Sequence, residues 1–103
     1  MHIIMWEFIV HPDKVREFVS AYKPEGDWAQ LFGLAAGYEG TELLSSINDG
    51  KRFVTIDRWS KADDYARFQE RFDERFNQQY RSLNAQLEGL TIRETNLGLF
   101  TTQ

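Results

Sequence analysis

The sequence predicts an α+β domain of the ferredoxin-like, split β-α-β kind, in which four strands form one antiparallel sheet. The first observation is the order of expected elements, which runs strand, helix, short helix, strand, strand, helix, strand. The second is the length, because 103 residues is the size of one domain and no linker or repeat divides the chain. We therefore expect residues 1–103 to form a single domain with both main helices on one face of the sheet.

Four segments have the composition of β-strands. Ile3–Val10 is rich in β-branched and aromatic residues and reads as the first strand. Glu39–Ile47 and Arg52–Trp59 are expected to form a hairpin around Asn48–Lys51, where Asp-Gly suits the positive φ angles of a tight turn. Leu90–Phe100 is expected to be the last strand. Together these segments predict the four strands of the sheet.

Helical periodicity fills the intervals between the strands. Pro12 suits the first position of a helix, because its missing N–H would have no partner there. Asp27 is placed to cap a shorter helix that extends to Phe32. A single long helix is expected over Ala62–Leu87, with Gly89 as its stop. Its aromatic stripe consists of Tyr65, Phe68, Phe72, Phe76 and Tyr80.

Composition excludes several classes of function. The formal net charge is −4, which gives no basic face for nucleic acid and argues against an anionic membrane surface. The chain has no cysteine, so disulfides, thiolate metal sites and cysteine nucleophiles are excluded. We expect no signal peptide and no membrane span, and a cytoplasmic location. His2 and His11 match no metal-ligand spacing, so no metal site is predicted.

The first predicted strand has apolar side chains on both faces. Successive side chains of a strand point to opposite sides. The two sets are Ile4, Trp6, Phe8 and Val10 on one side, and Ile3, Met5, Glu7 and Ile9 on the other. Because two helices cover only one face, we expect a second copy of the chain to cover the other, and hence a homodimer. The alternative is a central strand whose second face stays partly exposed.

Two stretches, Gly37–Leu44 and Phe53–Ser60, resemble antibiotic-biosynthesis-monooxygenase domains. In that family a glycine-containing turn leads into strand two, strand three ends in Trp, and a Ser-capped aromatic helix follows. The resemblance covers nearly the whole chain. It implies the dimeric α+β barrel, in which two sheets face each other and each subunit keeps a pocket between its sheet and its helices. Activities in the family include cofactor-independent oxygenation, haem degradation and isomerisation.

The resemblance carries over to particular residues only in part. Trp59 matches the Trp at the end of strand three, and Tyr65 matches a helix tyrosine of the cofactor-independent oxygenases. Those enzymes have Asn at the position of Thr55, whose hydroxyl donates one hydrogen bond and cannot replace an amide. The haem-degrading members use a helix His as iron ligand, and Ala62–Leu87 has none. The resemblance therefore implies no cofactor.

Polar and aromatic side chains supply the remaining candidates. Glu7 and Asp57 are candidate proton acceptors. The alternatives are an ion pair with arginine or water access at a barrel end for Glu7, and an inter-strand or interface salt bridge for Asp57. Trp28 and Phe32 are candidates for a lid over the pocket, and the alternative for both is ordinary core packing. Trp6 is a further candidate for contact with a bound ring.

Two hypotheses of function follow. The first is a cofactor-independent monooxygenase, or an isomerase, that acts on a small aromatic or quinol-like molecule. Trp59 and Tyr65 would line its pocket, and Glu7 or Asp57 would move protons. The second is a non-catalytic, ligand-binding or stress-associated homodimer of the same fold. A carboxyl or phenol that points into the pocket would favour the enzyme.

Overall fold

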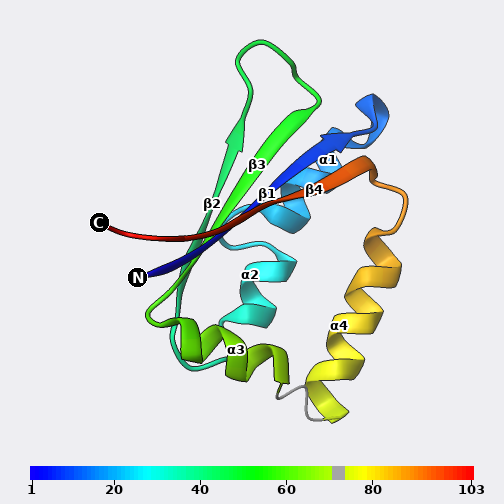
Figure 1. Cartoon of the computed structure of the whole chain (residues 1–103). Helices are drawn as coiled ribbons and strands as arrows, with labels where there is room; N and C mark the ends of the chain where they lie inside the picture. The colour runs from blue at the N-terminus through cyan, green and yellow to red at the C-terminus, as the bar shows by residue number, and fades with distance from the viewer. Residues whose placement is uncertain (71–73) are drawn as a thin grey trace.

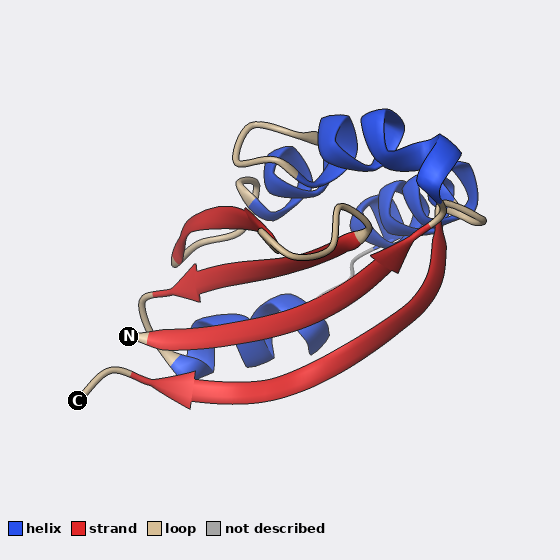
Figure 2. Cartoon of the chain, turned by 90° about the horizontal axis from the view of Figure 1, so that it is seen from above, coloured by secondary structure: helices blue, strands red, loops and turns tan. Residues whose placement is uncertain are grey.

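A computed structural model describes residues 1–70 and 74–103 of the chain, and the side chains of residues 74–77 also lie outside the description. The four strands form one sheet in the order β2-β3-β1-β4, and all neighbours are antiparallel. Seen from above, the strands curve together as one twisted layer (Figure 2). This is the predicted ferredoxin-like α+β fold. The strands are β1 (His2–Val10), β2 (Tyr38–Ser45), β3 (Arg52–Trp59) and β4 (Thr91–Thr101).

The helices connect the strands as the sequence predicts, with one difference in the second half. A 3₁₀ turn, Pro12–Lys14, leads into α1 (Val15–Tyr22), and α2 (Asp27–Phe32) follows. The single long helix expected over residues 62–87 is wrong, because α3 (Ala62–Glu70) and α4 (Glu74–Leu87) run in different directions (Figure 1). Phe72 and the side chain of Phe76, both members of the predicted stripe, lie outside the described residues.

Two local expectations are also corrected. The loop between β2 and β3 is longer than a tight turn and needs no positive φ, since Gly50 is not among the positive-φ glycines. Instead the Asp49 carboxylate accepts the N–H of Lys51 at 2.9 Å, and the Asp49 carbonyl accepts the N–H of Arg52 at 3.1 Å. Asp27 does not cap α2; it is the first residue of the helix, after Gly26.

The hydrophobic core joins one face of the sheet to the helices. Phe8 and Val10 of β1 pack with Phe18 of α1, and Ile4 packs with Phe68 of α3. These β1 residues belong to the even-numbered set, so that set points toward the helices. We call this side the pocket face. The opposite side, which carries Ile3, Met5, Glu7 and Ile9 of β1, is the outer face.

A bulge near the start of β2 changes the alternation of that strand. Tyr38 pairs with Trp59 and Gly40 pairs with Arg58, so two steps along β2 oppose one step along β3. Gly40 has φ +129°, a conformation that residues with a side chain rarely adopt. As a consequence Tyr38 and Thr41 both lie on the pocket face, although residues three apart in a regular strand would lie on opposite faces.

Candidate functional site

A cavity of about 390 Å³ lies between the pocket face and the helices. This volume falls within the range of small-molecule sites, about 300–1,000 Å³. All the sequence-predicted site residues except Glu7 line it. The sheet contributes Ile4, Trp6, Phe8, Thr41, Thr55, Asp57, Trp59 and Glu94. The helices contribute Tyr22, Trp28, Phe32, Tyr65, Phe68, Gln69, Tyr80 and Asn84.

Aromatic side chains make up most of the wall. The ring of Trp59 lies 5.5 Å from that of Tyr65 and 6.3 Å from that of Phe32, measured between centroids. Trp28 continues the series, 6.0 Å from Phe32 and 5.4 Å from Tyr80 on α4. Trp59 is only 1% exposed, so it forms part of the core behind the cavity as well as its wall. Rings in these offset and tilted arrangements offer flat apolar surfaces to a bound aromatic molecule.

Asp57 is the carboxyl group that β3 brings to this cavity. The Thr41 hydroxyl donates a hydrogen bond to its Oδ1 at 2.5 Å. Burial raises the pKa of Asp57 to about 6, and the bond from Thr41 opposes part of that rise. Thr55, two residues earlier on the same face, is 4% exposed. A carboxyl with this pKa exchanges protons near neutral pH, as a general base must.

Tyr65 brings a phenol to the same end of the cavity. Its hydroxyl accepts a hydrogen bond from Gln69 Nε2 at 3.0 Å, and its ring lies 5.5 Å from that of His2. Burial raises the pKa of Tyr65, and the nearby charge of Asp57 raises it further. The phenol therefore keeps its proton at neutral pH, so its O–H can donate a hydrogen bond to a bound molecule.

The cavity is also lined by side chains that the sequence did not predict, among them Tyr22, Asn84 and Glu94. Burial raises the pKa of Tyr22 to about 12, and the charge of Glu94 adds to that rise. The indole of Trp28 is close enough to lower the pKa of Tyr22 in part, but its Nε1 lacks a partner in hydrogen-bonding geometry among the described residues. Asn84 of α4 adds an amide to the lining.

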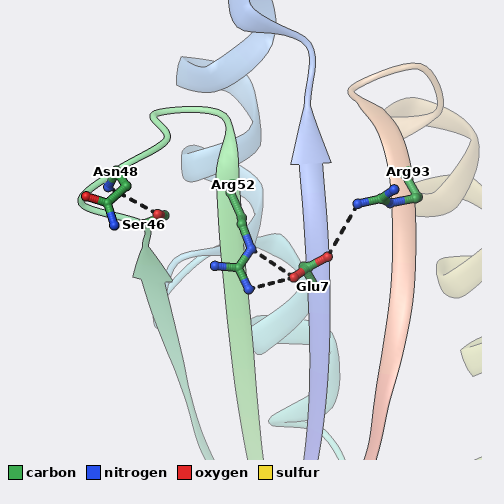
Figure 3. Close-up of polar contacts among 5 residues, drawn as sticks. All are labelled: Glu7, Ser46, Asn48, Arg52 and Arg93. Carbon is green, nitrogen blue, oxygen red and sulfur yellow. Dashed lines mark hydrogen bonds and ion pairs between the residues drawn. The ribbon is translucent and has the colours of Figure 1, made fainter.

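Glu7 lies on the outer face, away from the cavity. Arg52 donates to its Oε2 from both Nε and Nη2, each at 2.8 Å, and Arg93 lies 3.7 Å from its Oε1 (Figure 3). These contacts are the arginine pairing that was the alternative to a catalytic role. The structure therefore does not bring Glu7 together with Asp57 and Tyr65, and we leave Glu7 out of the proposed site.

Several other lining residues had only weak signals in the sequence. Tyr38 and Thr41 were missed, although an isolated glycine inside a strand pattern, here Gly40, is a known sign of a bulge. Tyr80 of α4 belonged to the predicted aromatic stripe, but nothing in the sequence assigned it, or the lining residues on α1 and β4, to a site. They come together only through the packing of helices whose directions the periodicity does not fix.

The described residues contain no group of three or more His, Asp or Glu side chains that could hold a metal ion. Within the same residues, no helix is both long and apolar enough to span a membrane. His2 contacts Tyr65 at the edge of the cavity, and the backbone of His11 bonds to Leu90 and Lys14 at the turn after β1.

The fold is that of solved structures named as antibiotic biosynthesis monooxygenases. One similar solved structure is SnoaB, a cofactor-independent oxygenase from Streptomyces nogalater, at 21% identity and a TM-score of 0.65, with 99% of this chain and 92% of that chain covered. A second is from Nitrosomonas europaea and bears a name that assigns it to these monooxygenases, at 18% identity and a TM-score of 0.67 over 99% and 98% of the two chains. A similarly named protein from Deinococcus radiodurans has 10% identity and a TM-score of 0.69 over 100% and 93%.

These identities are low, so the likeness establishes only the fold. The activity has to be argued from the residues that line the cavity. No family model matches the sequence, and no curated protein matches it.

Proposed function

We propose that this chain is a cofactor-independent monooxygenase that acts on a small aromatic, quinol-like molecule bound in the cavity. The observation that carries the proposal is Asp57, a carboxyl with a pKa of about 6 set in an aromatic cavity beside the phenol of Tyr65. The likeness to SnoaB, which is named as a cofactor-independent oxygenase, supports the proposal at the level of the fold.

Oxygenation without a cofactor requires a general base, a hydrogen-bond donor for the developing oxyanion, and the exclusion of water from the bound ring. Asp57 takes the proton from a ring hydroxyl of the substrate, and the resulting anion supplies electrons to molecular oxygen. In an anthrone-type substrate a ring CH₂ becomes C=O; one oxygen atom enters the new carbonyl, and the other leaves as water with the two hydrogens of that carbon. Tyr65 donates a hydrogen bond to the developing oxyanion, and the aromatic wall holds the ring and keeps water away.

The lining of the cavity favours the enzyme over a purely binding protein. A site that only binds an apolar ring needs no ionisable group, and burial of one is costly. Here a carboxyl and a phenol, Asp57 and Tyr65, line the same cavity, close enough for the charge of Asp57 to raise the pKa of Tyr65. Such perturbed pairs are typical of catalytic sites.

We also propose that the working form is a homodimer assembled through the outer face. Val54 and Ile56 of β3 are half-buried there beside the apolar residues of β1, while Leu44 and Phe100 are 45% and 46% exposed. The charges on this face pair within the chain, Glu7 with Arg52 and Arg93, and Glu42 with Arg58 at 2.6 Å. A second copy of this face would bury the apolar residues while these ion pairs stay formed within each chain.

The activity is tested by oxygen uptake with a panel of quinols and anthrone-type aromatics. The wild-type chain is expected to consume oxygen faster than the substrate does alone. Asp57→Asn removes the base and is expected to lower kcat by about 10²–10⁴-fold. Tyr65→Phe removes one donor and is expected to lower kcat by about 10²-fold or more.

Ligand binding, measured by quenching of tryptophan fluorescence, serves as the control for these variants. Both substitutions are expected to leave binding within about tenfold of wild type, because the aromatic wall is intact. Binding without oxygen uptake in the wild-type chain would contradict the enzyme and favour the non-catalytic ligand-binding protein. Equal rates for wild type and Tyr65→Phe would remove Tyr65 from the mechanism.

A further inference from the structure

Three side chains on neighbouring strands form a hydrogen-bonded series that ends in the cavity. The Tyr38 hydroxyl bonds to Thr41 Oγ1, and the Thr41 hydroxyl bonds to Asp57 Oδ1 at 2.5 Å. The first bond exists only because the bulge before Gly40 places Tyr38 and Thr41 on the same face. Bulges of this kind re-aim side chains and are common next to active sites.

The direction of the series follows from the number of protons. A threonine hydroxyl has one proton, and that of Thr41 is directed at Asp57. Its oxygen therefore accepts the bond from Tyr38, which keeps its proton at neutral pH because burial raises the pKa of its phenol. Both donors thus point toward the carboxylate. Thr41 is the one described hydrogen-bond partner of the Asp57 side chain, and Oδ2 is not among the fully buried, unpartnered side-chain atoms of the described residues. Because Asp57 lines the cavity, we take Oδ2 to be the oxygen that a bound ligand can reach.

From this geometry we infer that Tyr38 and Thr41 are positioning residues for Asp57: their hydroxyls form a donor chain that fixes Oδ1 and leaves Oδ2 to take a proton from the bound ligand. The inference rests on the proposed function for the identity of the base. It adds two residues on β2 that do not act on the substrate themselves. Their effect is to favour the ionised form of a carboxyl that burial disfavours.

Other ionisable groups line the same cavity, and their influence on the acidity of Asp57 has to be distinguished from that of Thr41 and Tyr38. The charge of Asp57 raises the pKa of Tyr65 on α3, and the ring of His2 on β1 contacts that of Tyr65. Glu94 on β4, Tyr22 on α1 and Tyr80 on α4 line the cavity as well. None of the described ones donates a hydrogen bond to Asp57, so only Thr41, with Tyr38 behind it, should change the acidity of Asp57 through a direct bond.

The test is a carboxyl carbon-13 NMR titration of the intact chain without ligand, with the Asp57 resonance assigned by its loss in Asp57→Asn. Thr41→Val keeps the shape of the side chain and removes the donor. It is expected to lower the acid dissociation constant of Asp57 by about tenfold, because a hydrogen bond to a charged group is worth at least about 1.4 kcal/mol. Tyr38→Phe is expected to change it in the same direction by a smaller factor.

Thr41→Ser is the matched control, because it keeps the hydroxyl and is expected to restore the wild-type titration. An unchanged or increased dissociation constant in Thr41→Val, or a Thr41→Ser titration that follows Thr41→Val, would overturn the inference. No effect of Tyr38→Phe would overturn the two-residue chain. If Thr41→Val fails to fold, Tyr38→Phe still tests the chain, because an unchanged or increased dissociation constant in that variant would overturn the inference.

The titration needs no substrate, so it separates this inference from the proposed function. A chain that consumes no oxygen, yet shows the expected titrations, would overturn the monooxygenase proposal and leave the donor chain in place. If the wild-type chain is active, Thr41→Val should also move the acid limb of its kcat/KM profile to higher pH. The size of that shift should match the change in the acid dissociation constant of Asp57. A purely structural role of Thr41 would lower activity without moving that limb.

Discussion

Asp57 experiences two opposing influences in the folded chain. Burial raises its pKa from the ordinary 3.8 to about 6, although the bond from Thr41 favours the charged form. Because the folded pKa lies above the unfolded one, ionisation of Asp57 costs stability. That cost is absent below pH 3.8, grows as the pH rises toward 6, and is fully present above 6. A group retained at such a cost is typical of a functional site.

The first residue-scale prediction concerns Asp57→Asn. Asn keeps an oxygen that accepts the bond from Thr41 but carries no charge, so it avoids the cost of ionisation. The variant is expected to be more stable than wild type at pH 8 by about 1–3 kcal/mol, and the gain should shrink as the pH falls through 6 and vanish near 3.8. Equilibrium urea unfolding across this range measures it. A gain that does not depend on pH would show that the carboxyl is not buried as described.

Some single residues could be assigned from the sequence and others could not. Thr55, Asp57 and Trp59 share one face because strand alternation is a local rule. Glu7 could not be assigned, because both faces of β1 are apolar and only the position of the helices tells them apart. Tyr38 and Thr41 could not be assigned for a different reason. Regular alternation would put them on opposite faces of the sheet, and the bulge places both on the pocket face.

At the scale of elements, the start of β2 depends on one backbone conformation. Gly40 has φ +129°, and a Cβ at this position would meet no atom within 4 Å. Any penalty for adding a side chain there therefore comes from the backbone and not from crowding. The bulge in turn determines whether Tyr38 reaches Thr41.

Gly40→Ala is accordingly expected to lower the free energy of unfolding by about 1–3 kcal/mol. Gly50→Ala is the matched control, because Gly50 also has open space around its Cα but no positive φ. It is expected to change the free energy of unfolding by no more than about 0.5 kcal/mol, because the backbone is not strained there and alanine lowers the conformational entropy of the unfolded chain. Chemical denaturation of both variants gives the comparison. Equal losses in the two would mean that the bulge does not require glycine.

The sequence predicted the elements well where their signals are local. The strands, the first helix and the hairpin follow from composition and periodicity to within one or two residues. The expectation of one long helix over 62–87 was wrong, because a continuous polar and aromatic pattern is the same for one helix as for two that run in different directions. The tight turn at Asp49-Gly50 failed because the Asp49 side chain makes the turn without a positive φ.

At the scale of the whole molecule, the two faces of the sheet have different roles. The pocket face carries the core and the cavity, and α1, α2 and α3 pack against it. The outer face carries a half-buried apolar surface with paired charges, and no described helix covers it. The apolar composition of β1 on both sides has two separate causes in this arrangement. One is the core of the chain, and the other is the proposed contact with a second copy.

The last prediction concerns that contact. The wild-type chain is expected to be a dimer at micromolar concentration, measured by size-exclusion chromatography with light scattering. Ile56→Glu places an unpaired charge in the middle of the outer face and is expected to weaken the dimer at least about tenfold, or about 1.4 kcal/mol. Ile47→Glu makes the same change on a side chain that is 99% exposed in the β2–β3 loop, and it is expected to leave the dimer intact. A wild-type monomer, or equal effects of the two variants, would contradict assembly through this face, and the half-buried residues of β1 and β3 would then be in contact with water.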